Sequence, residues 1–422
     1  MERLIVKGGE RLRGEIDVHG AKNSSLPILA ATLLCGGETV LHNCPKLSDV
    51  DAAIKILLYL GCDVKRNGDT VIINSDSINS SEIPESLMHE MRSSIVFLGA
   101  IISRMNKARL SFPGGCELGP RPIDLHISSL KKLGVAINEE YGALNCEAKN
   151  GLVGTKINLS FPSVGATENI MLASVMAKGE TIIHNAAQEP EIIDLANYLI
   201  SRGAKIKDAG QSTIIIEGVS KLTSTEYRVM PDRIVATTYI SAVSITGGDV
   251  LIKDINPDDL ESVIPVFEQA GTKVKVYKDS IFVCGPSIIR PVKNIRTMPY
   301  PGFPTDAQAP IMAMLTLSSG TSVFVENIFE SRYKHACELV RMGADIKVEG
   351  KVAIVQGVEK LYGASVEATD LRGGAALCIA ALVANGETKI HNIGHIDRGY
   401  EAIEQALGQL GAKIVREQYE VR

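Results

Sequence analysis

The sequence predicts an α/β protein that is built from six repeated units and divides into two domains. Three observations lead to this prediction. The chain has 422 residues, a length typical of two or three domains. An amphipathic helix that ends in glycine recurs six times, at intervals of 68 to 73 residues. Six further segments are apolar on nearly every side, which is typical of buried helices.

The amphipathic helix of each unit is followed by a glycine and then by a strand. Residues 53–65 and 195–207 share apolar positions at helical spacing, a glycine and an alternating strand. Glycine at a helix end favours the left-handed conformation that terminates the helix. A run of the form Gly-Glu-Thr-x-x-His-Asn precedes three of these helices, at residues 37–43, 179–185 and 386–392. The six helix-ending glycines are Gly61, Gly134, Gly203, Gly271, Gly343 and Gly411.

A second helix belongs to each unit. These helices are rich in alanine and lack a polar face, so we expect them to be buried inside the domains. The six segments are residues 24–34, 92–103, 167–177, 232–246, 306–317 and 372–384.

Conspicuous polar residues stand at the N-termini of these buried helices. Helix N-termini attract anions, and a basic residue there opposes the helix dipole, so it indicates an anionic partner. If the six helices point the same way, these residues converge. The basic residues are Lys22, Arg92, Arg233 and Arg372. Ser163, Thr167, Asp232, Thr305, Asp306 and Asp370 have a simpler interpretation as N-caps, which we favour for Thr167 or Thr305 alone.

Segments of a shared two-strand shape lie between the units, for example residues 6–18 and 355–368. The first copy stands at the N-terminus, and the last unit ends without one. We therefore expect residues 1–20 to complete the last unit. This predicts one three-unit domain of residues 21–230 and a second of residues 1–20 plus 231–422, with the active site in the cleft between them.

The stretch of residues 113–126 is expected to be a loop, because glycine and proline recur too often in it for a helix or strand. Its part at 111–122 is the expected catalytic loop of the first domain. Cys116 lies there between a glycine and a charge, with Arg121 close behind, which favours exposure and a lowered thiol pKa. The other seven cysteines lie in or beside apolar runs and are expected to be small core residues.

Composition narrows the function classes. A net charge of -5 gives no sign of a nucleic-acid partner or of a polybasic membrane anchor. The N-terminus lacks the apolar core of a signal peptide, and the longest apolar run, residues 375–384, is too short to span a bilayer. The cysteines show no zinc spacing, so we expect no bound metal and a reducing, cytoplasmic location.

Three motifs give the chain a specific resemblance to a known family over its whole length. They are Gly20-Ala21-Lys22-Asn23, the Pro-Gly-Gly-Cys…Arg-Pro loop of residues 113–122, and residues 395–401, His-Ile-Asp-Arg-Gly-Tyr-Glu. With its six units, the chain resembles the UDP-N-acetylglucosamine 1-carboxyvinyltransferases, also called UDP-N-acetylglucosamine enolpyruvyl transferases. The resemblance implies the enolpyruvyl transferase fold, a two-domain inside-out α/β barrel with buried helices and outer sheets.

The resemblance also implies a reaction. The family transfers the enolpyruvyl group of phosphoenolpyruvate to the 3′-hydroxyl of UDP-N-acetylglucosamine and releases phosphate, the first committed step of peptidoglycan synthesis. No metal or organic cofactor is implied. Beyond these two substrates we expect no nucleic acid, membrane or obligate protein partner.

By resemblance, the expected catalytic residues are Cys116, Asp306, Lys22 and Arg398. Cys116 is the general acid that protonates the methylene carbon, and the epoxide fosfomycin alkylates this cysteine in the family. Asp306 is the base for the sugar hydroxyl. The positions that match phosphate contacts are Lys22, Arg121 and Arg398, and those near the carboxylate are Arg332 and Arg372.

The resemblance further implies a set of contacts to the UDP-sugar. These are Asn23, Arg92, Arg121, Pro122, Ile123, Asp124, Leu125, Ser163, Val164, Gly165, Asp306 and Ile328. Two residues depart from the family: Phe161 stands where lysine is common, and Val96 stands where tryptophan is common.

Alternatives stay open for the function and for single residues. The sister enzyme, 3-phosphoshikimate 1-carboxyvinyltransferase, shares the fold and chemistry, but its family lacks a reactive cysteine in this loop. A catalytically silent, regulatory paralogue is the non-enzyme alternative, although Cys116, Asp306 and Arg398 are all present. Four residues of interest also have a purely structural interpretation. His126 and His395 could serve packing or positioning, and Asp124 could cap a helix. Arg398 could form a surface ion pair that contributes little to stability.

Overall fold

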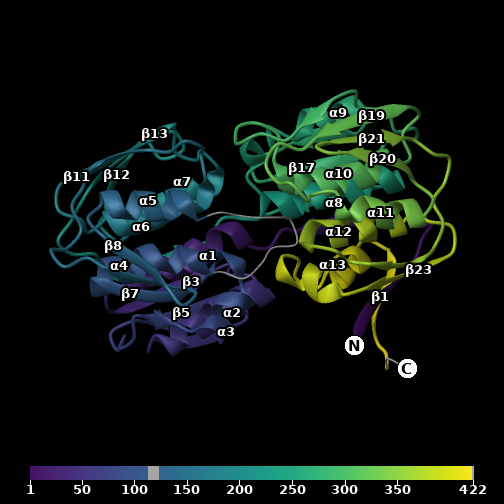
Figure 1. The fold of residues 1–422 in the computed structure, drawn as a ribbon. Helices are drawn as coiled ribbons and strands as arrows, with labels where there is room; N and C mark the ends of the chain where they lie inside the picture. The colour runs from purple at the N-terminus through teal and green to yellow at the C-terminus, as the bar shows by residue number, and fades with distance from the viewer. Residues whose placement is uncertain (113–122, 421–422) are drawn as a thin grey trace. The chain divides into compact units, whose positions relative to one another are not determined.

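The computed structural model describes residues 1–112 and 123–420 of the chain (Figure 1). These residues form two compact units. The first unit consists of residues 20–112 and 123–230, and the second unit consists of residues 1–19 and 231–420. Both contain helices and strands, so the predicted α/β class is confirmed. None of the described helices is both long enough and apolar enough to cross a membrane.

The first unit contains three four-stranded sheets with one shared plan. In each sheet a short edge strand runs parallel to its neighbour, and the remaining pairings are antiparallel. Their strand orders are β14(Glu226–Arg228)-β3(Glu38–His42)-β5(Thr70–Asn74)-β4(Asp63–Asn67), β6(Glu82–Ile83)-β7(Lys107–Ser111)-β9(Ala143–Glu147)-β8(Ala136–Glu140) and β10(Lys156–Asn158)-β11(Glu180–His184)-β13(Thr213–Glu217)-β12(Lys205–Lys207).

The second unit repeats this plan in three more sheets. The described strands thus form six separate sheets and not one closed barrel. The orders are β2(Arg13–Asp17)-β15(Asp249–Lys253)-β17(Ser280–Cys284)-β16(Lys273–Val276), β18(Ile295–Arg296)-β19(Thr321–Val325)-β21(Val352–Gln356)-β20(Asp345–Glu349) and β22(Ser365–Glu367)-β23(Glu387–His391)-β1(Glu2–Lys7)-β24(Lys413–Gln418).

The six apolar segments form buried helices, as predicted. Every residue of α8 is buried, and Figure 1 shows α8, α10 and α12 side by side inside the second unit. The predicted ends of α1, α6, α8, α10 and α12 are wrong by up to three residues, and α4 begins five residues after the predicted start at 92, because residues 92–96 form a separate short helix. For α6 the reason is that Ser163 caps the helix one turn earlier than expected. The buried helices are α1(Lys22–Ala31), α4(Phe97–Met105), α6(Val164–Ser174), α8(Arg233–Thr246), α10(Thr305–Leu315) and α12(Leu371–Ala381).

The amphipathic helices lie between the buried helices and solvent. They are α2(Ser48–Tyr59), α5(Asp124–Lys132), α7(Pro190–Ser201), α9(Ile264–Ala270), α11(Lys334–Arg341) and α13(Ile403–Gln409), with a short additional helix, α3(Glu85–Glu90). All six repeat glycines follow these helices with φ between +94° and +101°. This left-handed conformation strains any side chain with a Cβ, so the predicted role of these glycines as helix ends is confirmed.

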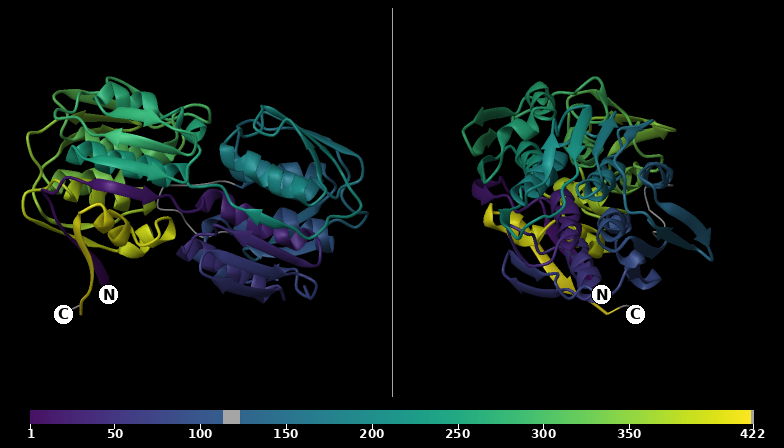
Figure 2. Two further views of the ribbon diagram at one scale, coloured as in Figure 1. Left: turned by 180° about the vertical axis from the view of Figure 1, so that it is seen from behind. Right: turned by 90° about the vertical axis from the view of Figure 1, so that its left-hand side faces the viewer.

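Strand β1 lies between β23 and β24, so it completes the last sheet as expected, but the expectation is wrong for residues 13–17, which form β2 and pair with β15 in another sheet. Figure 2 shows the purple N-terminal strand beside the yellow C-terminal strand. Leu4 and Val6 of this strand are fully buried in the core of the second unit.

Replacement of Leu4 by alanine should therefore destabilise the protein by about 2–5 kcal/mol, because it leaves a cavity in a closed core. Urea unfolding of the full chain measures the loss. The matched control is Ile5→Ala, since Ile5 is half-buried in the same strand and should cost markedly less. Equal losses for the two variants would contradict a buried, central position of β1.

The prediction that seven cysteines are core residues is correct for five and wrong for two. Cys35, Cys44, Cys62, Cys146 and Cys378 are buried, and burial raises the thiol pKa of Cys44, Cys62 and Cys146 to about 11. Cys284 is half-buried at the end of β17, and Cys337 is exposed on α11. Both lie beside apolar residues in sequence but on the outer side of their elements.

Candidate active site

The N-termini of the buried helices separate into capped and uncapped ends. Ser163 caps α6, Asp232 caps α8 and Asp370 caps α12, each accepting hydrogen bonds from backbone amides. The N-cap interpretation is therefore correct for these three. It is wrong for Thr167, Thr305 and Asp306, because α6 begins at Val164 and α10 begins at Thr305 after Pro304, so all three lie within their helices. The carboxylate of Asp306 is directed to other partners.

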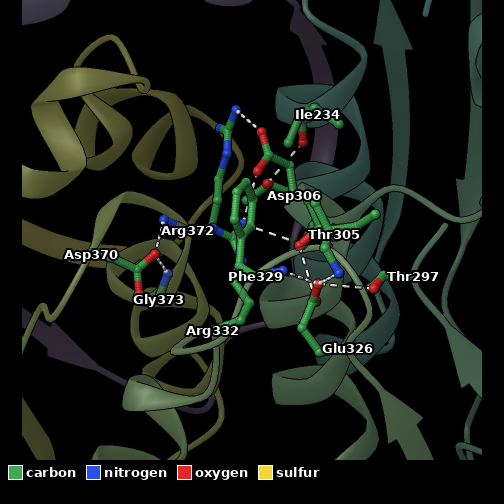
Figure 3. Close-up of polar contacts among 12 residues, drawn as sticks. Ile234, Thr297, Thr305, Asp306, Glu326, Phe329, Arg332, Asp370, Arg372 and Gly373 are labelled. Atoms are coloured by element: carbon green, nitrogen blue, oxygen red, sulfur yellow. Dashed lines mark hydrogen bonds and ion pairs between the residues drawn. The ribbon is translucent and has the colours of Figure 1, made fainter. Parts of the chain in front are cut away.

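Two buried guanidinium groups hold Asp306 (Figure 3). Nη2 of Arg332 donates to Oδ1 at 2.8 Å, and Nη2 of Arg372 donates to Oδ2 at 3.3 Å. The arginine side chains are only 2% and 1% exposed, whereas the aspartate is 26% exposed. The carboxylate thus lies at the open side of a buried cationic pair.

Both arginines have further donor capacity. Nε of Arg332, and Nε and Nη1 of Arg372, are buried and lack a hydrogen-bond partner among the described residues. The guanidinium of Arg332 lies over the ring of Phe329 at 5.7 Å, and that of Arg372 lies over Tyr400 at 5.3 Å. Aromatic faces stabilise such cations but accept no strong hydrogen bond. Two cations with unused donors beside an acid form a site suited to a carboxylate or phosphate ligand.

Lys22 stands at the start of α1 in the first unit, as predicted. Its Nζ lies 2.5 Å from Oδ2 of Asp49 in the first turn of α2, and both side chains are nearly buried. Asn23 follows it in the first turn and is half-buried. A buried lysine needs an anionic partner, and Asp49 supplies one in this structure.

Arg398 ends the short helix η4(Ile393–Arg398) and is half-buried. The neighbouring Asp397 is ion-paired with Arg416. The guanidinium of Arg416 donates to both carboxylate oxygens of Asp397, at 3.0 and 2.6 Å. Asp397 therefore shares Arg416 with Glu404 and Glu2, which also accept hydrogen bonds from its guanidinium.

The expected sugar-nucleotide residues lie on several elements. Val164 and Gly165 form the first turn of α6, where helix amides have no intrahelical acceptor. Asp124 begins α5 and is exposed, so the helix expected to start there is confirmed, although its N-cap is Ile123. Three further positions fall elsewhere: Leu125 in α5, Ile328 after β19, and the exposed Phe161 before α6.

Four predicted site residues cannot be compared with the structure. Cys116, Arg121 and Pro122 lie outside the described residues, as does the side chain of Arg92, whose backbone begins the helix η2(Arg92–Val96). Val96 ends η2 and is buried, so the position where relatives often have tryptophan belongs to the core. Within residues 1–112 and 123–420, no three His, Cys, Asp or Glu side chains are placed to hold a metal ion.

His126 has a structural role, which was one of its alternatives. Its ring is buried, and its Nδ1 accepts a hydrogen bond of 2.7 Å from the amide of Asn169 in α6. The oxygen of the same amide accepts from the backbone N–H of Gly99, so the direction of the bond to histidine is fixed. Burial lowers the pKa of His126 to about 4, against a smaller opposing effect of Asp124. The neutral ring ties α5 to α6.

The protein should therefore lose stability in acid through His126. In the unfolded chain the His126 side chain has a pKa near 6.5. Between about pH 6.5 and pH 4, His126 is therefore protonated in the unfolded state but neutral in the folded state. Between pH 7.5 and 5.0 this costs roughly 2 kcal/mol. Urea unfolding of wild type and His126→Gln at both pH values measures the difference.

The comparison must be made between the two proteins at each pH. Glu168 in the same unit has a pKa raised by burial and by Glu191 and Glu189. Its protonation therefore stabilises the folded state as the pH falls, in wild type and in His126→Gln alike. An equal pH dependence in the two proteins would contradict a buried, neutral His126.

Two residues of the site were missed from the sequence. Asp49 resembled an ordinary acid in a first helical turn, and nothing in its pattern indicated Lys22 as its partner. Glu326 is 1% exposed and accepts four hydrogen bonds beside Asp306. A comparison of the repeats could have found Glu326, because it occupies the position of Asn43, Asn185 and Asn392.

Comparison with known proteins gives matches along nearly the whole chain. The family described as EPSP synthase (3-phosphoshikimate 1-carboxyvinyltransferase) matches residues 6–407. The chain is 52% identical to UDP-N-acetylglucosamine 1-carboxyvinyltransferase 2 of Caldanaerobacter subterraneus, over 99% of this chain and 100% of that protein. It is 48% identical to UDP-N-acetylglucosamine 1-carboxyvinyltransferase 1 of Symbiobacterium thermophilum, over 98% and 95% of the two chains.

Solved structures show the same fold. The enolpyruvyl transferase NikO from Streptomyces tendae superposes with a TM-score of 0.88 at 25% identity, over 98% of each chain. EPSP synthase from Acinetobacter baumannii gives a TM-score of 0.78 at 18% identity, over 99% of this chain and 100% of that one. This second likeness concerns the fold alone. Together they confirm the predicted enolpyruvyl transferase fold, with six separate sheets around the buried helices.

Proposed function

The chain belongs to the UDP-N-acetylglucosamine 1-carboxyvinyltransferases, within the wider EPSP synthase family, and from this premise we propose how its residues carry out the reaction. The enzyme transfers the enolpyruvyl group of phosphoenolpyruvate to the 3′-hydroxyl of UDP-N-acetylglucosamine and releases phosphate. This step belongs to peptidoglycan synthesis. Both substrates are phosphorylated, so the reaction needs cations, an acid for the methylene carbon and a base for the sugar hydroxyl.

The observation that carries the assignment is the position of Asp306 between Arg332 and Arg372. The unused donors of the two guanidinium groups suit the carboxylate of phosphoenolpyruvate. When that carboxylate binds them, it competes with Asp306 for the same cations. Asp306 is then released to accept the proton of the 3′-hydroxyl as the oxygen attacks the central carbon of phosphoenolpyruvate.

The remaining roles follow the family motifs. Lys22, Arg121 and Arg398 bind the phosphate group, and Lys22 exchanges its partner Asp49 for that group when the substrate enters. Cys116 protonates the methylene carbon, which completes the addition across the double bond. Loss of phosphate, with return of a methyl proton to the thiolate of Cys116, then restores the double bond on the sugar ether.

The sugar nucleotide is proposed to contact the first turn of α6. The amides of Val164 and Gly165 point out of a helix N-terminus, which favours an anionic diphosphate. They compensate for Phe161, which offers no charge where relatives often have lysine. The other proposed contacts are Asn23, Arg92, Arg121, Pro122, Ile123, Asp124, Leu125, Ser163, Asp306 and Ile328.

A phosphate-release assay tests the function. Phosphoenolpyruvate is supplied with UDP-N-acetylglucosamine, with shikimate 3-phosphate, or alone. Release only with the sugar nucleotide is expected. Release only with shikimate 3-phosphate would move the chain to the sister activity, and binding of the sugar nucleotide without release would identify a silent paralogue.

Two further statements belong to this proposal. Phosphoenolpyruvate and nucleotide sugars are metabolites of the cytoplasm, so we place the enzyme there. Its loop thiol makes it a target of fosfomycin, which alkylates Cys116. No cofactor, nucleic acid or membrane enters the proposed reaction.

A further inference from the structure

Glu326 is a buried carboxylate that joins three separate segments of the second unit (Figure 3). Its Oε1 accepts from the hydroxyl of Thr297 at 2.9 Å and from the backbone N–H groups of Ile328 and Phe329 at 2.8 and 3.0 Å. Its Oε2 accepts from the hydroxyl of Thr305 at 3.0 Å. These four partners lie after β18, in the loop after β19 and at the start of α10. A buried carboxylate with four neutral donors is well satisfied and rigid.

The repeat shows that this arrangement is a departure from the common plan. In three other units the residue after the corresponding strand is Asn43, Asn185 or Asn392, each with φ between +54° and +56°. Asn43 and Asn185 donate to the carbonyls of Val229 and Leu159, which directly follow the short edge strand of their sheets. In those two units the asparagine side chain therefore holds the edge strand.

Glu326 binds the same edge strand through a different bond and adds contacts to two other segments. Thr297 directly follows the edge strand β18 and donates its hydroxyl to Glu326, while its carbonyl, which corresponds to those of Val229 and Leu159, accepts from Nδ2 of Asn327 at 3.2 Å. The longer, charged side chain also reaches the loop of residues 326–333 and the first residue of α10. These two additional segments carry Arg332 and Asp306.

We propose that Glu326 is a positioning residue, which fixes the general base Asp306 and the cation Arg332 relative to each other through Thr305 and the loop of residues 326–333. One branch runs through Thr305 to the first turn of α10, where the next residue is Asp306. The other branch runs through the amide of Phe329, whose ring lies against the guanidinium of Arg332. Arg332 in turn donates to the carbonyl of Thr305 at 3.2 Å, which closes the circuit. The role rests on the function proposed above.

The first experiment removes only the hydrogen bond from Thr305 to Glu326, which lies on the side of the base Asp306. Thr305→Val removes the hydroxyl with little change in shape, and Thr305→Ser is the matched control that restores it. We expect kcat to fall about 10- to 100-fold in Thr305→Val, because a small displacement of a catalytic group has an effect of this size. The affinity for UDP-N-acetylglucosamine and the melting temperature should stay near wild type, and Thr305→Ser should stay within about threefold of wild-type kcat.

Two results would overturn the proposal. One is a wild-type kcat in Thr305→Val, or an equal loss in Thr305→Ser. The other is a loss of kcat matched by an equal loss of sugar-nucleotide affinity, since this would indicate general disruption of the unit and not a displaced base.

A second measurement does not depend on turnover. Hydrogen exchange of the full chain should show loss of protection at the amides of Ile328 and Phe329 in Glu326→Ala. Glu326→Gln should keep that protection, because its amide oxygen still accepts from both N–H groups. Unchanged protection in Glu326→Ala would show that Glu326 does not hold the loop of residues 326–333, and would overturn the proposal. If wild type released no phosphate in the assay above, the proposed function would fail. The exchange result would still show whether Glu326 holds the loop of residues 326–333.

Discussion

Replacing Asp306 by asparagine is expected to lower kcat about 10²–10⁴-fold, the usual contribution of a positioned general base. Asparagine cannot take the proton of the sugar hydroxyl, although its oxygen can still accept a bond from Arg332 or Arg372. The same change removes the anion that competes with the substrate carboxylate for both arginines. The KM for phosphoenolpyruvate should therefore not rise. Steady-state phosphate release, with titration of UDP-N-acetylglucosamine by calorimetry, separates these effects.

The matched control for charge removal is Asp345→Asn, since Asp345 is an exposed carboxylate of β20 in the same unit. This variant should keep wild-type kinetics. If Asp306→Asn changed only the affinity for the sugar nucleotide and left kcat intact, Asp306 would be a binding residue and another group would have to serve as the base.

Cys116→Ser is expected to reduce turnover about 10²–10⁴-fold, because a hydroxyl is a far weaker acid than a thiol. Cys116→Asp should retain activity and resist alkylation by an epoxide, since a carboxyl group can donate a proton but is a poor nucleophile. Activity assays with and without prior fosfomycin treatment, followed by mass spectrometry of the labelled peptide, measure both effects.

Cys337→Ser is the appropriate control, because Cys337 is an exposed thiol of the second unit with no proposed role. It should leave both turnover and fosfomycin sensitivity unchanged. Near-normal turnover of Cys116→Ser would remove Cys116 from the role of acid.

The elements of the fold were largely predictable because they depend on local rules that recur six times. A glycine such as Gly61 or Gly411 is required wherever the chain leaves a helix in the left-handed conformation, so its spacing counts the units. The burial of α8 was equally evident, because a helix without a polar face has no stable position at a surface. The ends of α6 were less certain, since a cap such as Ser163 shifts a helix by a turn.

The contacts of the site were not predictable in the same way. Family motifs indicated Asp306, Arg332 and Arg372 as separate residues, but the ion pairs between them join three elements whose approach no local pattern specifies. Asp49 and Glu326 were missed for this reason. In the sequence, Asp49 resembles an ordinary acid in a first helical turn, and Glu326 resembles an ordinary polar residue after a strand. Only the comparison of Glu326 with Asn43 and its equivalents makes the difference visible.

The pairing of β1 has a consequence for the order in which a growing chain can fold. Leu4 pairs with Ile390 and Arg416, so its partners leave the ribosome last. The first unit, in contrast, has all its strands between residues 38 and 228 and can be completed while the second is still being translated. During that interval the apolar face of the first strand made, with Leu4 and Val6, has no sheet to join. The earliest residues of the chain therefore acquire their native strand partners only when translation is nearly finished.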